Sequence, residues 1–329
     1  MKLLITIISI FFVVQLYAQQ LPQYSQYFRN QVMMNPGAYG MYDFTDITLG
    51  GRYQWVGFDN SPKTAYGYFS TVLNSTKSRY NPSLRTSNGP FRNPRVSTGK
   101  VKHALGGQIV LDEYGAFRQY SFAGVYAIHM PLTRTTNLSF GTKVGISNNS
   151  FLQERATVLT QLPGYNGPAM SDPEYDSYIA NQSNLNYLDI GAGFYYYGDR
   201  FFVGVSSDQL TQDLVSFGSG TADFDPTMHF NFTGGYKFDL NDNVTLMPAV
   251  LIKYMKPAPL SIEGSLQFEY QEWLWFGLSY RHTDAVVGMV GCNISERFKF
   301  GYSYDFTVSR LNQMNSGGHE VILGIMLGR

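Results

Sequence analysis

The sequence has few charged residues and no long apolar run beyond its start. Charged side chains make up 15% of the 329 residues, well below the ~25% typical of soluble domains. Much of the protein surface therefore faces something other than water. After the first 18 residues, no stretch approaches the roughly 18 consecutive apolar residues of a membrane-spanning helix. A closed β-barrel is the remaining structure that satisfies every backbone hydrogen bond in lipid.

The sequence is also poor in residues that carry catalysis, metal binding or disulfides. Cys292 is the single cysteine, which excludes an intramolecular disulfide, and it is interpreted as a small buried or half-buried strand residue. The five histidines are scattered, with no pair four residues apart, and glycine-rich nucleotide loops and the serine-hydrolase motif are absent. The formal net charge of zero offers no broad basic field for nucleic acid. We therefore expect no enzyme, no metal, no cofactor and no nucleic-acid partner.

The chain begins with a pattern typical of an exported protein. A basic start precedes an apolar run over residues 3–14, and Ala18 supplies the small residue of a cleavage site. The run is too short to span a bilayer. We expect residues 1–18 to be a signal peptide, residues 19–45 a periplasmic or plug segment, and residues 46–329 an outer-membrane barrel.

Polar and apolar side chains alternate along much of the sequence. Between Ile47 and Trp55, for example, Leu49 and Tyr53 share one face while Arg52 lies on the other. A soluble sandwich also alternates, so the informative detail is the character of the two faces. In many segments one face is aromatic or aliphatic and the other carries charges, as expected for an all-β transmembrane barrel with lipid outside and a polar lumen.

About fourteen such segments can be counted, and an even number is what single-chain bacterial barrels require. They lie near residues 46–55, 63–74, 104–112, 117–129, 135–147, 187–196, 200–207, 227–239, 243–253, 260–270, 273–282, 284–293, 296–306 and 319–328. If the first strand starts in the periplasm, the short turns at 130–134, 197–199, 240–243, 271–272 and 295–296 are periplasmic. The long connections at 148–186, 208–226 and 307–318 are then outer loops, which is the asymmetry expected of these barrels.

The connection over residues 75–103 does not fit this asymmetry, because it is long yet falls on the periplasmic side. It contains no acidic residue and is strongly basic, with Lys77, Arg79, Arg85, Arg92, Arg95, Lys100 and Lys102. It is interpreted as a solvated loop, as a docking surface for an acidic partner, or as a missed pair of strands.

A few further residues allow two interpretations. The acidic residues within 172–176 suit a solvated loop or a calcium site. Glu263 and Glu269 share a predicted inner face and suit the lumen wall better than a pair of acid and base. Trp273 and Trp275 suit an aromatic girdle or the rim of the lumen.

Three motifs lie at the start of the predicted mature chain. They are Gln23-Tyr24-Ser25-Gln26-Tyr27-Phe28, then Asn35-Pro36-Gly37-Ala38-Tyr39-Gly40, and then the spaced residues Arg52, Trp55, Gly57, Pro62 and Thr64. This order resembles the opening of the PorP/SprF family of Bacteroidetes outer-membrane proteins, in which a P-Q-[FY]-S-Q-Y segment precedes an N-P-A-Y-A-G-like segment. Gly37 is an insertion relative to that pattern. The motifs end at Thr64, and the rest agrees in barrel periodicity and length.

The resemblance implies a component of the type IX secretion system in the outer membrane. It implies a role in secreting or anchoring a large surface protein, such as a gliding adhesin, that bears a C-terminal secretion domain. Its partners would be that cargo, other components of the secretion system and outer-membrane lipid.

The segment before the first predicted strand is aromatic, amide-rich and nearly uncharged. We expect it to pack in the lumen or against the periplasmic mouth and to close the barrel, rather than to form a mobile tail. Two functions are compatible with these features of the sequence. The first is a secretion accessory that holds cargo through its long outer loops; the alternative is a porin or transporter for small solutes, motivated by the polar inner face.

Overall fold

The computed structural model describes residues 22–73, 98–156, 175–176, 184–211, 216–217, 227–256, 258–271, 273–295, 297–309, 313 and 315–328. The expected signal peptide, residues 1–18, lies outside the described residues. Among the described residues, no helix has the length and apolar character needed to cross a membrane.

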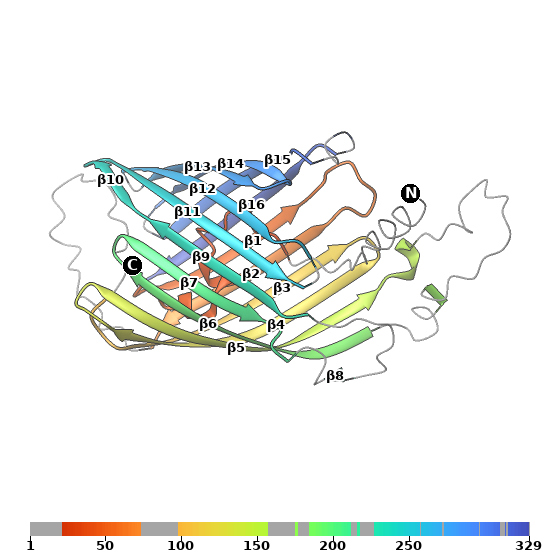
Figure 1. Cartoon of the computed structure of the whole chain (residues 1–329), viewed down its shortest axis with the longest axis horizontal. Helices are drawn as coiled ribbons and strands as arrows, with labels where there is room; N and C mark the ends of the chain where they lie inside the picture. The colour runs from red at the N-terminus through yellow and green to blue at the C-terminus, as the bar shows by residue number, and fades with distance from the viewer. Residues whose placement is uncertain are drawn as a thin grey trace, which may run out of the picture.

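One antiparallel sheet closes into a barrel of fourteen strands (Figure 1), which confirms the expected fold. The strands are β1 (Thr45–Tyr53), β2 (Lys63–Val72), β3 (Lys102–Tyr114), β4 (Phe117–Pro131), β5 (Thr136–Phe151), β6 (Asn184–Gly198), β7 (Phe201–Asp208), β9 (His229–Tyr236) with β10 (Phe238–Asn241), β11 (Val244–Met255), β12 (Ser261–Tyr270), β13 (Leu274–Arg281), β14 (Ala285–Asn293), β15 (Phe298–Thr307) and β16 (Gly318–Leu327). Closure comes from the pairing of β1 with β16, and the short β8 (Ser216–Phe217) pairs with β6 outside this circuit.

The segments β9 and β10 form one strand with a local interruption. Both pair with β11, with Gly235 opposite Ala249 and Phe238 opposite Leu246. Pro248 lies between these partners in β11 and has no N–H to donate to the ladder. The break at Lys237 therefore follows from a proline on the neighbouring strand.

The alternation of side chains separates lipid from lumen. In β1, Leu49 is 62% exposed on the outer face while its neighbour Thr48 is fully buried inside. Leu323 and Glu320 of β16 divide in the same way. The outer face therefore presents apolar side chains to hydrocarbon, and the inner face carries the charged ones.

The two ends of the barrel differ in their connections. One end, here called the turn end, carries the starts of β1 and β15, the end of β16 and mostly short connections such as that between β6 and β7. The other end, the loop end, carries the connection from β5 to β6, which includes the short η3 (Gln153–Arg155), and that from β7 to β9. Short turns are periplasmic in outer-membrane barrels, which assigns the turn end to the periplasm.

Residues 22–44, here called the plug segment, fill the lumen before β1 begins (Figure 1). The segment contains two short helices, α2 (Gln31–Met34) and η1 (Pro36–Ala38). Its side chains form an apolar core with inward residues of the wall: Tyr24, Tyr27, Phe28, Met33, Met34, Tyr66, Tyr68, Leu251, Trp275, Val287, Met289 and Ile322. Part of the inner wall is therefore apolar because it packs against the plug segment rather than water.

Two local expectations are resolved by this arrangement. Trp275 is 3% exposed and packs edge-on against Phe28 in the lumen, whereas Trp273 is 46% exposed at the turn end. The expected loop over residues 75–103 is too long at its end, because β3 already begins at Lys102. Residues 74–97 lie outside the described residues.

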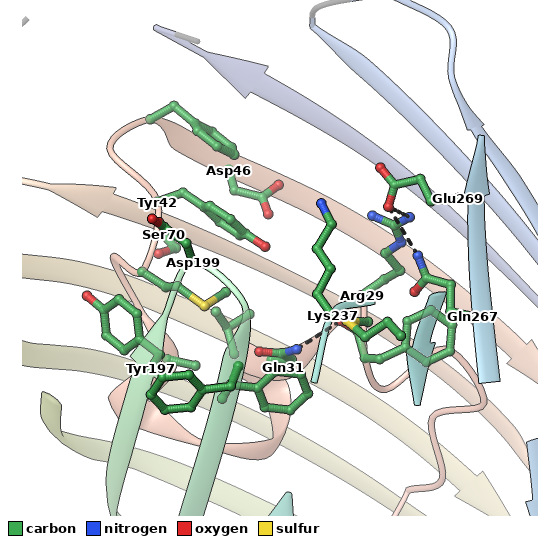
Figure 2. A pocket seen from close by; sticks show the side chains of 18 of the residues that line it. Arg29, Gln31, Tyr42, Asp46, Ser70, Tyr197, Asp199, Lys237, Gln267 and Glu269 are labelled. Atoms are coloured by element: carbon green, nitrogen blue, oxygen red, sulfur yellow. Dashed lines mark hydrogen bonds and ion pairs between the residues drawn. The ribbon is translucent and has the colours of Figure 1, made fainter. Parts of the chain in front are cut away.

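A cavity of ≈ 560 Å³, here called the vestibule, opens at the turn end (Figure 2). Its lining combines plug residues such as Arg29 and Met41 with strand residues such as Lys237, Met247 and Gln267. The plug segment thus separates the vestibule from the loop-end half of the lumen.

Candidate functional site

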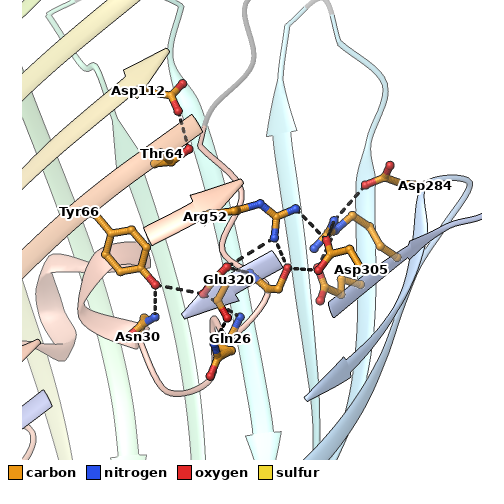
Figure 3. Close-up of polar contacts among 12 residues, drawn as sticks. Gln26, Asn30, Arg52, Thr64, Tyr66, Asp112, Asp284, Asp305 and Glu320 are labelled. Carbon is orange, nitrogen blue, oxygen red and sulfur yellow. Dashed lines mark hydrogen bonds and ion pairs between the residues drawn. The ribbon is translucent and has the colours of Figure 1, made fainter. Parts of the chain in front are cut away.

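The first contact between the plug segment and the wall is a buried charged cluster toward the loop end (Figure 3). Arg52 Nη2 of β1 lies 2.7 Å from Asp305 Oδ2 of β15, and Nη1 lies 3.4 Å from Glu320 Oε2 of β16. The cluster extends to Arg281 of β13, whose Nε donates to Glu263 Oε2 at 2.9 Å. Each of these charged side chains is nearly inaccessible to solvent, so each depends on its partners.

Ser25 inserts the plug segment into this cluster. Its backbone N–H donates to Glu320 Oε2 at 2.7 Å, and its hydroxyl donates to Asp305 Oδ1 at 2.7 Å. The same hydroxyl accepts a hydrogen bond from Arg52 Nη1. Farther along, Tyr66 donates to Glu320 Oε1 at 3.0 Å and accepts from the Asn30 amide at 2.9 Å. The cluster is therefore completed by residues of the plug segment.

The second contact lies on the wall formed by β5, β6 and β7. The Asn35 side-chain amide donates to two strand carbonyl oxygens, of Phe194 at 3.0 Å and of Val205 at 3.2 Å. Its Oδ1 accepts from the Gly37 N–H at 2.8 Å, which starts the η1 turn. These contacts hold the Asn-Pro-Gly turn directly against the sheet backbone.

Three wall glycines, here called the glycine seat, make this approach possible: Gly141, Gly193 and Gly204. A Cβ on Gly193 would lie 2.2 Å from Asn35 Oδ1, and one on Gly141 would lie 2.3 Å from the Pro36 carbonyl carbon. Such distances are shorter than any non-bonded contact, so side chains at these positions would displace the plug segment.

The third contact fixes the end of the plug segment at the turn end. The Tyr39 carbonyl oxygen lies 2.6 Å from His129 Nε2, which donates because a carbonyl only accepts. Lys102 Nζ donates to the carbonyl oxygens of Gly40 at 2.8 Å and Met41 at 3.2 Å. Gly40 has a φ of +76°, a conformation that favours glycine, and a Cβ there would lie 2.2 Å from Ala104 Cβ.

The side chain of Tyr39 belongs to the same contact. Burial raises the pKa of its hydroxyl above the ordinary value, so the hydroxyl is protonated and donates to Gln108 Oε1 at 3.2 Å. A Cβ on Gly106 would lie 2.2 Å from the Tyr39 ring. The ring therefore also rests on a strand position that only glycine leaves open.

The structure gathers most of the motif residues around the lumen. Those that lie in the plug segment are Gln23, Tyr24, Ser25, Gln26, Tyr27, Asn35, Pro36, Tyr39 and Gly40. Arg52 and Thr64 are inward on β1 and β2, where Thr64 donates to Asp112 Oδ1 at 2.5 Å. Trp55, Gly57 and Pro62 lie apart from them, in the loop-end connection between β1 and β2, where Trp55 and Gly57 have positive φ.

The basic segment divides into residues with and without a described structure. Lys77, Arg79, Arg85, Arg92 and Arg95 lie outside the described residues. Lys100 is exposed, and its carbonyl oxygen accepts from the Asn137 amide at 3.4 Å. Lys102 is buried in the wall and binds the plug segment, so it is not part of a solvated or docking loop.

Several important residues had no signal in the sequence. Glu320 and Asp305 lie 295 and 280 positions from Ser25, so only closure of the barrel reveals the contact. Gly193 resembles any other strand glycine. Glu263 and Glu269 do lie in the lumen wall, where Arg281 and Arg29 pair with them at 2.9 Å and 3.3 Å.

Comparisons with known proteins agree with this architecture. A mutant of the monoaromatic hydrocarbon channel TodX is 8% identical, with a TM-score of 0.50 over 91% of this chain and 94% of that one. The toluene transporter TbuX of Ralstonia pickettii is 9% identical, with a TM-score of 0.49 over 90% and 92%. At 8% identity the likeness to the TodX mutant shows the fold alone. No curated protein matches the chain.

The family comparison covers nearly the whole chain. The model described as "Type IX secretion system membrane protein PorP/SprF" matches residues 16–325. Together with the barrel fold, this match places the protein in the outer membrane. The chain therefore belongs to the PorP/SprF family of type IX secretion system membrane proteins.

Proposed function

We propose that this protein is a non-enzymatic secretion accessory that holds a large surface protein, such as a gliding adhesin, at the outer membrane. It binds the C-terminal secretion domain of that cargo through connections at its loop end. The observation that carries the proposal is the plug segment, which is fixed to opposite walls of the lumen by Ser25 and Asn35.

A plugged lumen suits a holding role better than a transport role. The plug segment lies so close to the wall at the glycine seat that no side chain larger than hydrogen fits there. Its aromatic residues also share one apolar core with the wall. Solutes would have to break both contacts to pass. Such tight packing indicates that the plug segment is a fixed part of a rigid barrel rather than a gate that opens for solutes.

The loop end supports the second part of the proposal. It carries three long connections, between β5 and β6, β7 and β9, and β15 and β16, whereas the turn end has one, between β2 and β3. Loops on a rigid scaffold are where binding residues concentrate. Several long connections at one end suit binding of a folded secretion domain better than binding of a small solute.

Deletion of the gene tests this proposal. The expected result is loss of one specific large protein from the cell surface, restored by the full chain, with general permeability of the outer membrane unchanged. Normal display of every surface protein in the deletion strain would contradict the proposal. A reduced uptake of small solutes with intact display would instead favour the porin or transporter.

A further inference from the structure

We propose that the vestibule is a binding site for the C-terminal end of a partner polypeptide that arrives from the periplasmic side. The terminal carboxylate pairs with Lys237, and a peptide N–H of the bound end donates to Gln267. This site lies at the opposite end of the barrel from the loops assigned to cargo, and it stands whether or not that assignment holds.

Of the charged residues that line the vestibule, the half-buried Lys237 and the exposed Asp199 are the two without an ion pair among the described residues. Lys299 Nζ lies 2.8 Å from Asp46 Oδ2, and Arg29 Nη2 lies 3.3 Å from Glu269 Oε2. Among the lining residues that the structure describes, Lys237 has no acidic partner, and Figure 2 shows its side chain extended into the cavity. A half-buried ammonium group in that position attracts a carboxylate.

The position of Lys237 is set by the backbone. It lies at the break between β9 and β10, beside the proline of β11, and its N–H donates to the Arg200 carbonyl oxygen at 2.6 Å. Arg200 itself pairs with Asp239 at 2.9 Å near the rim. The wall therefore holds Lys237 in place without neutralising it.

Buried polar atoms without partners supply the second half of the site. Gln267 is 3% exposed and lines the vestibule, and its Oε1 has no hydrogen-bond partner in the described structure. Arg29 Nε is likewise buried without a partner, although its guanidinium packs over the Trp275 ring at 4.8 Å. A buried acceptor and donor of this kind are usually satisfied, and a peptide backbone offers both complements once the side chains of Gln267 and Arg29 turn toward the cavity.

The remaining lining favours apolar side chains on the ligand. Met41 and Phe44 of the plug segment and Phe202 and Met247 of the wall all face the cavity. Methionine side chains adapt to differently shaped partners. An apolar residue next to the terminal carboxylate therefore packs on this surface.

Size and access favour a chain end over an internal segment. The cavity of ≈ 560 Å³ is within the range that takes a small ligand or a few residues of peptide. The plug segment closes its inner side, so an inserted chain cannot continue through the barrel. A polypeptide terminus enters such a dead end, whereas an internal loop needs room to turn back.

The test is the binding of a library of N-terminally fluorescein-labelled tetrapeptides to the detergent-solubilised full-length barrel. Each peptide is made as a C-terminal acid and as an amide, and binding is measured by fluorescence anisotropy. We expect acids with an apolar penultimate residue to bind at least ~10-fold more tightly than their amides, because the carboxylate makes a charge-assisted hydrogen bond. Absence of binding, or equal binding of acids and amides, would overturn the proposal.

Variants identify the residues involved. Lys237→Met removes the preference for acids, Lys237→Arg retains it, and Gln267→Leu weakens both forms. Lys256→Met, a matched change at the loop end, leaves binding unchanged. A retained preference in Lys237→Met would refute the site, as would equally tight binding of amidated peptides that end in Asp. The comparison of acids and amides on the unmodified protein needs no variant to fold.

Discussion

Asn35 of the plug segment and Gly193 of β6 are in such close contact that a Cβ on the glycine would lie 2.2 Å from Asn35 Oδ1. The same asparagine donates to carbonyl oxygens on β6 and β7. The second sequence motif therefore has a structural explanation: its asparagine donates directly to the sheet backbone, at a place where the contacting wall residues are glycines.

Gly193→Ala is expected to dislodge the Asn-Pro-Gly turn. The added methyl group overlaps the Asn35 side chain, and overpacking of this kind costs about 1–3 kcal/mol. The measurement is the urea midpoint of unfolding from lipid vesicles, followed by gel mobility. Gly264→Ala is the matched control, since nothing lies within 4 Å of a Cβ there. Equal urea midpoints for the two variants would show that the plug segment does not pack tightly on the glycine seat.

Arg52→Met is expected to destabilise the protein far more than loss of a surface ion pair. It leaves Glu320 buried without a cation and Asp305 with only Arg281, whose Nη1 lies 3.4 Å away, and breaking a buried pair costs about 3–5 kcal/mol. Arg200→Met removes an exposed pair with Asp239 and is expected to cost no more than about 1 kcal/mol. Similar unfolding free energies for both variants would show that the cluster does not hold the structure together.

Lys102→Met is expected to release the turn-end part of the plug segment. Two carbonyl oxygens lose a charged donor, so local opening at Met41 becomes at least ~10-fold more frequent. The rate of maleimide labelling of Met41→Cys, in a Cys292→Ser background, reports this opening. Lys100→Met is the neighbouring control and leaves the rate unchanged. An unchanged labelling rate in Lys102→Met would show that Lys102 does not hold this part of the plug segment.

Trp275→Ala is expected to weaken the lumenal core. Trp275 packs against Phe28 and lies under the Arg29 guanidinium, and truncation of a buried tryptophan costs about 3–5 kcal/mol. Trp273→Ala removes a half-exposed side chain at the turn end and has a smaller effect. Thermal unfolding followed by near-ultraviolet circular dichroism compares the two. A larger loss of thermal stability for Trp273→Ala than for Trp275→Ala would show that Trp275 is not part of the main lumenal core.

The strands were predictable because each strand residue faces either lipid or the lumen, and this choice is visible in the sequence one residue at a time. Each of the fourteen expected segments overlaps one strand of the barrel, since lipid and lumen impose a period of two wherever the chain crosses. The start of β3 was missed because Lys102 and His103 follow a run of basic residues and read as loop. A buried lysine at a strand end has no local signature.

The plug segment was predictable only in part. Its aromatic and amide-rich composition indicated a place in or under the lumen, which the structure confirms. Its contacts were not predictable, because Ser25 meets residues of β15 and β16 only after the barrel closes. The glycine seat was missed for the same reason, since a strand glycine gives no indication of what approaches it.

Single-channel conductance of the unmodified protein in planar bilayers measures whether the plug segment seals the lumen. A barrel held closed by the Arg52 cluster and the glycine seat is predicted to insert without measurable current. Removal of residues 22–44 is predicted to produce open channels, which shows that the assay detects insertion. Stable, long-lived channels from the unmodified protein would show that the plug segment does not close the lumen.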